Sequence, residues 1–353
     1  MSAGRTRRLS RRYALLGTPQ GYQLPFSLVL RDIFAPASDS AFGGRLTKRR
    51  EGLMRCGQIR IAAMIAALIP IALGSAQAAQ GASPSTPTKV ETGMVKLTDS
   101  DIQYFSRGRG ESIVLLPGGT LTVGYLDEVA DGLAKAGYRV VGINFRGSGK
   151  STGSSKGVTL QTMADDVAGV VQSLKLGPVH VAGNDFGNRV ARMYAASHPE
   201  LTRSVILLAA GGKIQPKPAA MHALEVIFNP KSTDAEVIAI MPYLVSNPAD
   251  SARMWDLFKP SRAPGAGGIE REAAESTPLA TWWAPPGKIK YLILQGADDQ
   301  IAPPENGDVL KKDLGERATL VNVPGAAHLL PLEQPETTVS HMIRFIQQVG
   351  GKP

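Results

Sequence analysis

The stretch Val179-His-Val-Ala-Gly-Asn-Asp185-Phe-Gly-Asn-Arg-Val-Ala191 has the pattern of a short apolar strand, a tight turn and the start of a helix. Gly183 and Gly187 stand two positions before and after Asp185. A strand and a helix can approach closely at such a turn only if the flanking residues are small. The pattern therefore predicts a strained elbow that presents the carboxylate of Asp185 at the end of a buried strand.

On both sides of this elbow, apolar runs of strand length alternate with segments of helical spacing. The strand-like runs are 112–116, 139–143, 179–182, 204–208 and 290–294, and the helical segments are 123–136, 160–174 and 187–197. Runs that are apolar throughout suit strands covered on both faces. Their alternation with helices predicts an α/β fold with a largely parallel sheet.

The alternation is interrupted at 212–286, where Pro, Ala, Met and Trp residues crowd together. This segment has the pattern of several short helices inserted between two strands. Because ligands of parallel α/β sheets bind at the carboxyl ends of the strands, such an insertion is a candidate cap over the site. We therefore expect a core of residues 94–211 and 287–349 with a helical cap at 212–286.

Three further segments place polar groups where the elbow would need them. The strand at 290–294 leads into a loop with Asp298 and Asp299, and a strand at 318–323 leads into Pro324-Gly-Ala-Ala-His328. An early strand ends in Leu115-Leu-Pro-Gly-Gly119. All three segments follow apolar runs, so parallel strands would bring them to the same edge of the sheet as Asp185.

The G-x-D-x-G elbow, an Asp in a D-x-x-x-P context and a His after the last strand resemble, in this order, the α/β-hydrolase superfamily. With Asp at the elbow, the chain is similar to epoxide hydrolases and to haloalkane and fluoroacetate dehalogenases. The resemblance implies an α/β-hydrolase fold, with a mostly parallel central sheet, helices on both faces and an inserted helical cap. It also implies that Asp185 is the nucleophile, Asp299 the acid (rather than Asp298) and His328 the base.

The same resemblance assigns the oxyanion hole to the backbone N–H groups of Gly119 and Phe186. In the reaction that it implies, Asp185 forms an alkyl ester with the substrate, and water activated by His328 then cleaves that ester. No metal or organic cofactor is implied. One departure from the family pattern is Pro117, where the family usually has His.

The residues that separate the Asp-nucleophile families match only in part. Haloalkane dehalogenases have Trp directly after the nucleophile, where this chain has Phe186. Fluoroacetate dehalogenases use two Arg residues, of which only Arg189 is present, and epoxide hydrolases use two cap tyrosines, of which only Tyr243 is present. Trp282 and Trp283 make the cap apolar. We therefore expect Arg189, Tyr243, Trp282 and Trp283 to line a pocket for a small hydrophobic molecule.

Two other readings stay open at this point. The chain could be an esterase or lactonase in which Asp185 acts as a base or a poor nucleophile. It could also be a ligand-binding homologue that keeps the pocket without the chemistry. The presence of both Asp299 and His328 favours an enzyme, because a pure binder needs no acid–base pair.

The formal charge of +9 arises in the N-terminal region. Residues 1–78 hold 12 of the 39 Lys and Arg residues but 3 of the 30 Asp and Glu residues, which leaves 27 of each for the remainder. The excess therefore gives no reason to expect a nucleic-acid partner. The expected partner is a small-molecule substrate, and no pattern in the sequence sets the oligomeric state.

A signal peptide accounts for part of this charge. Residues 54–78 combine a basic start, an apolar run at 61–73 and a small-x-small cleavage pattern that ends at Ala78. The run is shorter than the ~20 residues of a membrane-spanning helix. We expect export to the periplasm or the medium, without stable membrane insertion after cleavage. Residues 1–53 are then an upstream extension or a start assigned too early, and 79–93 is a linker.

Two patterns mimic other sites. Arg146-Gly-Ser-Gly-Lys-Ser151 resembles the end of a phosphate-binding P-loop, but Asn144 stands where that motif requires its first glycine. Asp165 and Asp166 form a pair of acids, which we interpret as the solvated, dipole-complementing start of a helix rather than a catalytic pair.

Overall fold

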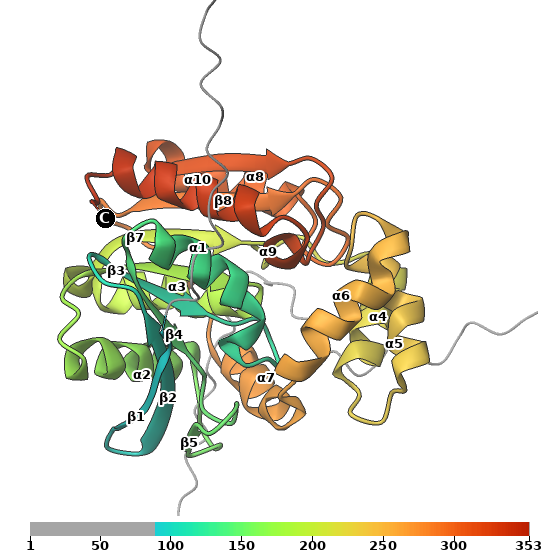
Figure 1. The fold of residues 1–353 in the computed structure, drawn as a ribbon, viewed down its shortest axis with the longest axis horizontal. Coiled ribbons are helices and arrows are strands. Elements are labelled where there is room, and N and C mark those ends of the chain that lie inside the picture. The colour runs from blue at the N-terminus through green and yellow to red at the C-terminus, as the bar shows by residue number, and fades with distance from the viewer. Residues whose placement is uncertain (1–88, 353) are drawn as a thin grey trace, which may run out of the picture. The chain divides into compact units, whose positions relative to one another are not determined.

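The computed structural model describes residues 89–352, which form a twisted central sheet covered by helices (Figure 1). Within these residues the sheet order is β1-β2-β4-β3-β6-β7-β8-β9, with β5 beside β2. The strands from β4 across to β9 run parallel, whereas β1, β2 and β5 are antiparallel additions at one edge. The bounds are β1 (Glu91–Lys96), β2 (Ser100–Arg107), β3 (Ser112–Leu116), β4 (Arg139–Ile143), β5 (Thr152–Gly153), β6 (Val179–Asn184), β7 (Thr202–Leu208), β8 (Lys290–Gly296) and β9 (Ala318–Val323).

Helices cover both faces of the sheet. Because successive residues of a strand point to opposite faces, each strand contributes side chains to two hydrophobic cores. In β3, Ile113 and Leu115 pack into one core and Val114 and Leu116 into the other. The first core is closed by α1 (Asp127–Lys135) and α10 (Pro335–Gln348). The second is closed by α2 (Leu160–Ser173), α3 (Phe186–Ser197) and α8 (Glu305–Leu314). The predicted fold class, a mostly parallel sheet between helical layers, is confirmed.

The segment between β7 and β8 is helical. It holds α4 (Pro218–Phe228), α5 (Asp234–Ile240), α6 (Ser251–Phe258) and α7 (Gly267–Ser276). Figure 1 shows α4, α5 and α6 grouped at one side of the molecule, with α7 closer to the sheet. Trp255 and Phe258 of α6 are buried, and the Phe258 ring lies 6.1 Å from that of Tyr125. These contacts join the cap to the first core.

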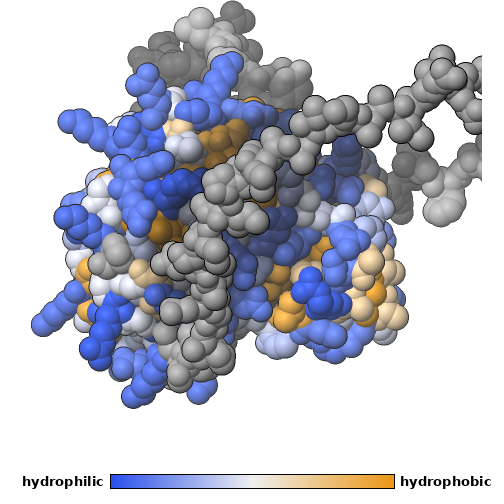
Figure 2. Space-filling view, turned by 45° about the horizontal axis from the view of Figure 1, so that its top comes forward, coloured by the Kyte–Doolittle hydropathy of each residue, from blue (hydrophilic) through white to orange (hydrophobic). Residues whose placement is uncertain are grey.

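Hydrophobic residues also reach the surface on the cap side of the molecule (Figure 2). Phe228 of α4 and Leu257 of α6 keep 41% and 38% of their area exposed. Among residues 89–352, no helix is long and apolar enough to cross a membrane.

The edge strands are the part of the core that the sequence pattern did not indicate. β1 begins at Glu91, inside the span expected to be a linker, and pairs with β2 from Glu91 opposite Ser106 onward. Of the six residues of β1, only Val95 is buried. A strand with so little apolar burial leaves no apolar run to detect. The expected signal peptide at 54–78 and the upstream segment 1–53 lie outside the described residues.

Candidate active site

The elbow at Asp185 has the strained geometry that its glycines permit. Asp185 follows β6 directly and precedes α3, with φ 46° and ψ −111°, a conformation that costs an L-residue free energy. A Cβ atom on Gly183 would lie 2.2 Å from the carbonyl oxygen of Gly187, and one on Gly187 would lie 2.5 Å from that of Pro117. The Asp185 N–H donates to the carbonyl oxygen of Leu208 at 3.0 Å. The sheet therefore holds the turn, and both glycines are sterically required.

The structure brings Asp185, His328 and Asp299 together at the carboxyl ends of β6, β8 and β9. His328 Nε2 lies 3.7 Å from Asp185 Oδ1, and His328 Nδ1 lies 3.1 Å from Asp299 Oδ2. Asp299 is buried, and its Oδ1 accepts the N–H groups of Ile301 and Ala302 at 2.9 and 2.7 Å. This fixes the carboxylate so that it orients the imidazole. Asp298 is exposed, so Asp299 is the acid of this loop that reaches the histidine.

The three side chains of the triad differ in how far they are exposed to solvent. The Asp299 side chain is fully buried and that of His328 is 8% exposed, whereas a third of the Asp185 side chain is exposed. Asp185 is therefore the member of the three that an incoming molecule can reach.

The two oxygens of Asp185 have different partners. Asp185 Oδ2 accepts the backbone N–H of Gly119 at 3.0 Å, while Oδ1 faces His328. Phe186 borders the same point, since a Cβ atom built on Gly119 would lie 3.6 Å from that of Phe186. The N–H of Gly119, expected to serve an oxyanion hole, thus holds the carboxylate at the elbow itself.

Tyr125 braces this arrangement and was missed from the sequence. Its buried hydroxyl accepts the N–H of Gly118 at 2.8 Å and donates to Asn184 Oδ1 at 2.5 Å. Burial raises the pKa of Tyr125, so the hydroxyl keeps its proton. One side chain therefore ties the Gly118-Gly119 loop to the residue before the elbow. Nothing in the local pattern of residues 123–136 marks a tyrosine for this role.

Glu270 is the second residue that sequence reasoning missed. It lies in the first turn of α7 and is 4% exposed, and its Oε2 accepts the N–H of Thr120 at 2.7 Å. Burial raises the pKa of Glu270 to about 8; the Thr120 N–H opposes the shift and the Asp185 charge adds to it. A carboxyl from the cap, protonated at neutral pH, thus stands beside the elbow.

Electrostatics favour a charged His328 in the free protein. Burial alone would lower the pKa of His328, but the charge and hydrogen bond of Asp299, then the charges of Asp185 and Glu333, raise it to about 9. Glu333 is held by the N–H groups of Ser246 and Ala327 at 2.6 and 2.8 Å. Removing the charge of Asp185 would remove one of the attractions that keep the imidazole protonated.

The four residues expected to line a substrate pocket make contacts with other side chains of the protein. Trp282 and Trp283 are 3% and 4% exposed, and the Arg192 guanidinium lies 4.5 and 4.9 Å from their ring centres. Arg189 lies 5.8 Å from the Trp282 ring. Tyr243 is half-buried against the first core. The contacts of these four residues with a substrate stay a prediction.

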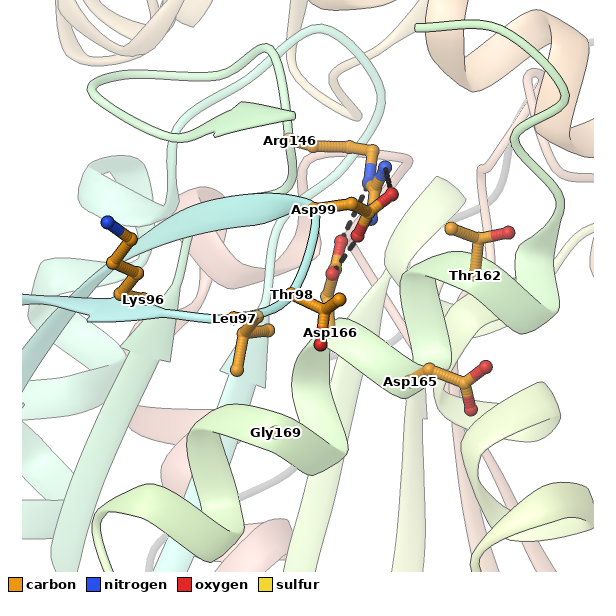
Figure 3. Close-up of a pocket in the computed structure, with 9 residues that line it drawn as sticks. All are labelled: Lys96, Leu97, Thr98, Asp99, Arg146, Thr162, Asp165, Asp166 and Gly169. Atoms are coloured by element: carbon orange, nitrogen blue, oxygen red, sulfur yellow. Dashed lines mark hydrogen bonds and ion pairs between the residues drawn. The ribbon is translucent and has the colours of Figure 1, made fainter. Parts of the chain in front are cut away.

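A surface pocket of about 650 Å³ lies elsewhere, beside β1 and α2 (Figure 3). Figure 3 shows Arg146 reaching toward Asp99 and Asp166. Arg146 binds Asp166 at 2.8 Å and Asp99 at 3.4 Å. These groups satisfy one another, and Arg146, from the P-loop-like segment, is 1% exposed. The charged residues that line this pocket therefore form a structural ion-pair network rather than a ligand-binding site.

The interpretation of Asp165 and Asp166 as a solvated helix start was wrong for the position of both acids and for the solvation of Asp166, whereas Asp165 is exposed as expected. Helix α2 begins at Leu160, so both acids lie within it. Asp166 is 6% exposed and binds Ser100 as well as Arg146, whereas Asp165 accepts from Gln161 and contacts His198. The partner of Asp166, twenty residues away in sequence, could not be recognised from the pair alone. Within residues 89–352, no cluster of three or more His, Cys, Asp or Glu side chains could hold a metal ion.

Comparison with known proteins agrees with this geometry. Residues 111–335 match the family described as alpha/beta hydrolase fold. The AB hydrolase superfamily protein YisY of Bacillus subtilis is 26% identical over 248 residues, which cover 67% of this chain and 92% of YisY. The 2-hydroxy-6-oxo-6-phenylhexa-2,4-dienoate hydrolase of Comamonas testosteroni is 26% identical over 241 residues, which cover 62% of this chain and 82% of that enzyme.

Among solved structures, a thermophilic esterase from Thermogutta terrifontis superposes with a TM-score of 0.61 at 22% identity, covering 73% of this chain and 99% of the esterase. At this identity the likeness concerns the fold. The chain belongs to the α/β-hydrolase family and is a hydrolase of that superfamily. None of these three proteins is described as an epoxide hydrolase or a dehalogenase, and membership of the Asp-nucleophile branch stays a prediction.

The negative charge of Asp185 contributes to the raised pKa of His328. In Asp185→Asn, the pKa of His328 should fall below its value of about 9, because a carboxylate that favours the imidazolium becomes a neutral amide. NMR titration of the imidazole ring signals measures this change. Asp298→Asn, the same substitution at the exposed acid beside Asp299, should leave His328 unchanged. An identical titration of His328 with and without Asp185 would contradict the electrostatic coupling.

Proposed function

We propose that this hydrolase uses Asp185 as a nucleophile, which forms an alkyl ester with a small hydrophobic substrate, and that water activated by His328 then cleaves the ester. The observation that carries the proposal is that the two carboxylate oxygens of Asp185 have different partners. Oδ2 is bound by the Gly119 N–H at 3.0 Å, and Oδ1 is 3.7 Å from His328 Nε2. Epoxides and alkyl halides are the substrate classes that such a carboxylate can attack.

The first step suits the way in which Asp185 is held. A hydrogen bond to Oδ2 fixes the carboxylate, and the partly exposed side chain leaves Oδ1 as the attacking atom. An enzyme that attacks a carbonyl carbon needs the oxyanion N–H for the oxygen of its substrate. Here Asp185 already occupies that donor, so an ester substrate would have to displace it. Attack on a saturated carbon needs no such displacement, which favours alkyl transfer over acyl transfer.

The second step uses the same hydrogen bond for a different purpose. After alkylation, Oδ2 is the carbonyl oxygen of the new ester, and the Gly119 N–H polarises it and stabilises the oxyanion formed by attacking water. One such donor is worth about 10²–10³ in kcat. The ester carries no charge, so the pKa of His328 falls and more of the imidazole is in the neutral form that can accept a proton from water. Alkylation itself thus prepares the base for the next step.

Hydrolysis of an ester or lactone is the second candidate. In such a reaction Asp185 would act as a base or a poor nucleophile, with Asp299 and His328 in the same places. A ligand-binding homologue without chemistry is a third reading. Panels of epoxides, haloalkanes and p-nitrophenyl esters distinguish the three readings when they are assayed with the unmutated protein and with Asp185→Asn. Ester hydrolysis that survives the substitution would favour a mechanism without an Asp185 ester.

The alkyl ester should accumulate when the base is removed. In His328→Gln, the first step should persist and the second should slow by about 10²–10⁴, the usual worth of a general base. Mass spectrometry of the peptide that contains Asp185 should then show an adduct of the substrate's mass. Asp185→Asn should show none, and His341→Gln, a substitution in α10, should turn over without accumulation. Normal turnover by His328→Gln would contradict the role of the base.

We further propose that the protein is exported, with residues 54–78 as a cleaved signal peptide. The mature chain should then begin at or near Ala79 and occur outside the cytoplasm. N-terminal sequencing of protein from fractionated cells of the native host tests this proposal. Recovery of residues 1–53 on the mature protein would refute both the signal peptide and the late start.

A further inference from the structure

The carboxyl group of Glu270 is the strongest unexplained feature near the elbow. Its Oε2 accepts the Thr120 N–H at 2.7 Å, but Oε1 is buried without a hydrogen-bond partner. Burying a polar oxygen without a partner costs stability.

Glu270 and Asp185 are bound by consecutive residues of one loop. The N–H of Gly119 holds Asp185 Oδ2, and the N–H of Thr120 holds Glu270 Oε2. A Cβ atom on Gly119 would lie 3.5 Å from the Asp185 oxygen and 3.4 Å from the Glu270 oxygen. Thr120 has φ 57°, so the loop turns its two N–H groups toward the two carboxyl groups. The acids therefore flank the same residue.

Burial of Glu270, and then the negative charge of Asp185, oppose ionisation of the Glu270 carboxyl group. Asp185 has His328 as a partner for its charge. Among the contacts of residues 89–352, Glu270 has the Thr120 N–H and no cation. The proton therefore resides on Glu270, in agreement with a pKa that burial raises to about 8. Oε1, which is shielded from water and has no partner, is the atom on which we place that proton.

We propose that Glu270 is a catalytic acid of this site, which protonates the oxygen that leaves when Asp185 opens an epoxide. The inference rests on the proposed function and narrows its substrate class to epoxides. Asp185 Oδ1 forms a bond to an epoxide carbon, the bond from that carbon to the ring oxygen breaks, and the oxygen takes the proton of Glu270. When water cleaves the ester, the diol leaves and Asp185 regains its charge. Before water attacks, His328, no longer beside a charged Asp185, gives up its proton through solvent and Glu270 is protonated again; the neutral imidazole then takes a proton from the attacking water, which restores the charged His328.

Glu270→Gln separates proton transfer from positioning. The amide oxygen of Gln can still accept the Thr120 N–H, but the side chain has no acidic proton. Glu272→Gln is the matched control, because Glu272 lies in the same helix and also accepts a backbone N–H, that of Gly157 at 2.7 Å. Both substitutions are made in the unmutated protein and in His328→Gln, which retains the adduct.

The probes are styrene oxide and (2-bromoethyl)benzene, which share a carbon skeleton but differ in the leaving group. Bromide leaves without a proton, whereas the epoxide oxygen needs one. In Glu270→Gln, adduct formation at Asp185 should slow by about 10²–10⁴ with the epoxide and by less than about threefold with the bromide. With Glu270 present, the epoxide rate should fall as the pH rises through about 8, where Glu270 loses its proton. In Glu270→Gln this decline should be absent.

A measurement of stability tests the protonated state without any substrate. The folded-state pKa of about 8 exceeds the ordinary value of 4.5, so ionisation of Glu270 in the unfolded chain lowers stability as the pH rises between these values. The unfolding temperature of Glu270→Gln, relative to the unmutated protein, should therefore rise from pH 5 to pH 8. A constant difference would mean that folded Glu270 is ionised, which overturns the proposal.

The remaining outcomes are also decisive. Equal slowing of epoxide and bromide in Glu270→Gln would overturn the acid role and leave a residue that positions the Thr120 loop. An unchanged epoxide rate and pH profile would overturn it as well. No adduct from either probe in the protein with Glu270 intact would contradict the nucleophilic role of Asp185, and the acid role would fall with it. These outcomes therefore distinguish a refuted acid role of Glu270 from a refuted nucleophilic role of Asp185.

Discussion

The hydrogen bond from the Gly119 N–H to Asp185 Oδ2 is the interaction on which the site depends. It fixes one oxygen of the carboxylate and leaves the other facing His328. The bond requires the elbow to hold Asp185 at a positive φ, and close packing at Gly183 and Gly187 permits this conformation. It also requires the Gly119 loop to stay near the elbow, which the hydroxyl of Tyr125 ensures. Backbone strain and a buried side chain together position one carboxylate.

The charges of the site are arranged around a single imidazole. Asp299 and Asp185 both favour a protonated His328, while Glu270, deprived of a cation, keeps its own proton. In this arrangement the nucleophile is charged and the cap acid is neutral, which is the combination that opening of an epoxide requires. Alkylation of Asp185 removes one negative charge and with it part of the attraction that protonates His328. The reaction thus changes the protonation state of its own base in the direction that the second step needs.

The strands and the elbow could be predicted from the sequence because both are encoded locally, whereas the grouping of Asp185, Asp299 and His328 was predicted from the resemblance in the order of their motifs. Strands buried on both faces are apolar throughout, and the small residues around Asp185 are required by the turn itself. Tyr125 and Glu270 could not be found in this way. Glu270 reaches Thr120 across 150 positions of the chain, and this contact depends on how α7 docks onto the sheet. Asp166 was misread for the same reason, since its partners lie on other elements.

Isotope labelling tests most directly whether Asp185 forms a covalent ester. In a single turnover of the unmutated enzyme in ¹⁸O-water, water attacks the carboxyl carbon of Asp185, so the label should first appear in the protein. The product of that turnover should carry the unlabelled oxygen taken from Asp185. Mass spectrometry of the Asp185 peptide and of the product measures both. Label in the first product and none in Asp185 would mean that water attacks the substrate itself, which would contradict the account.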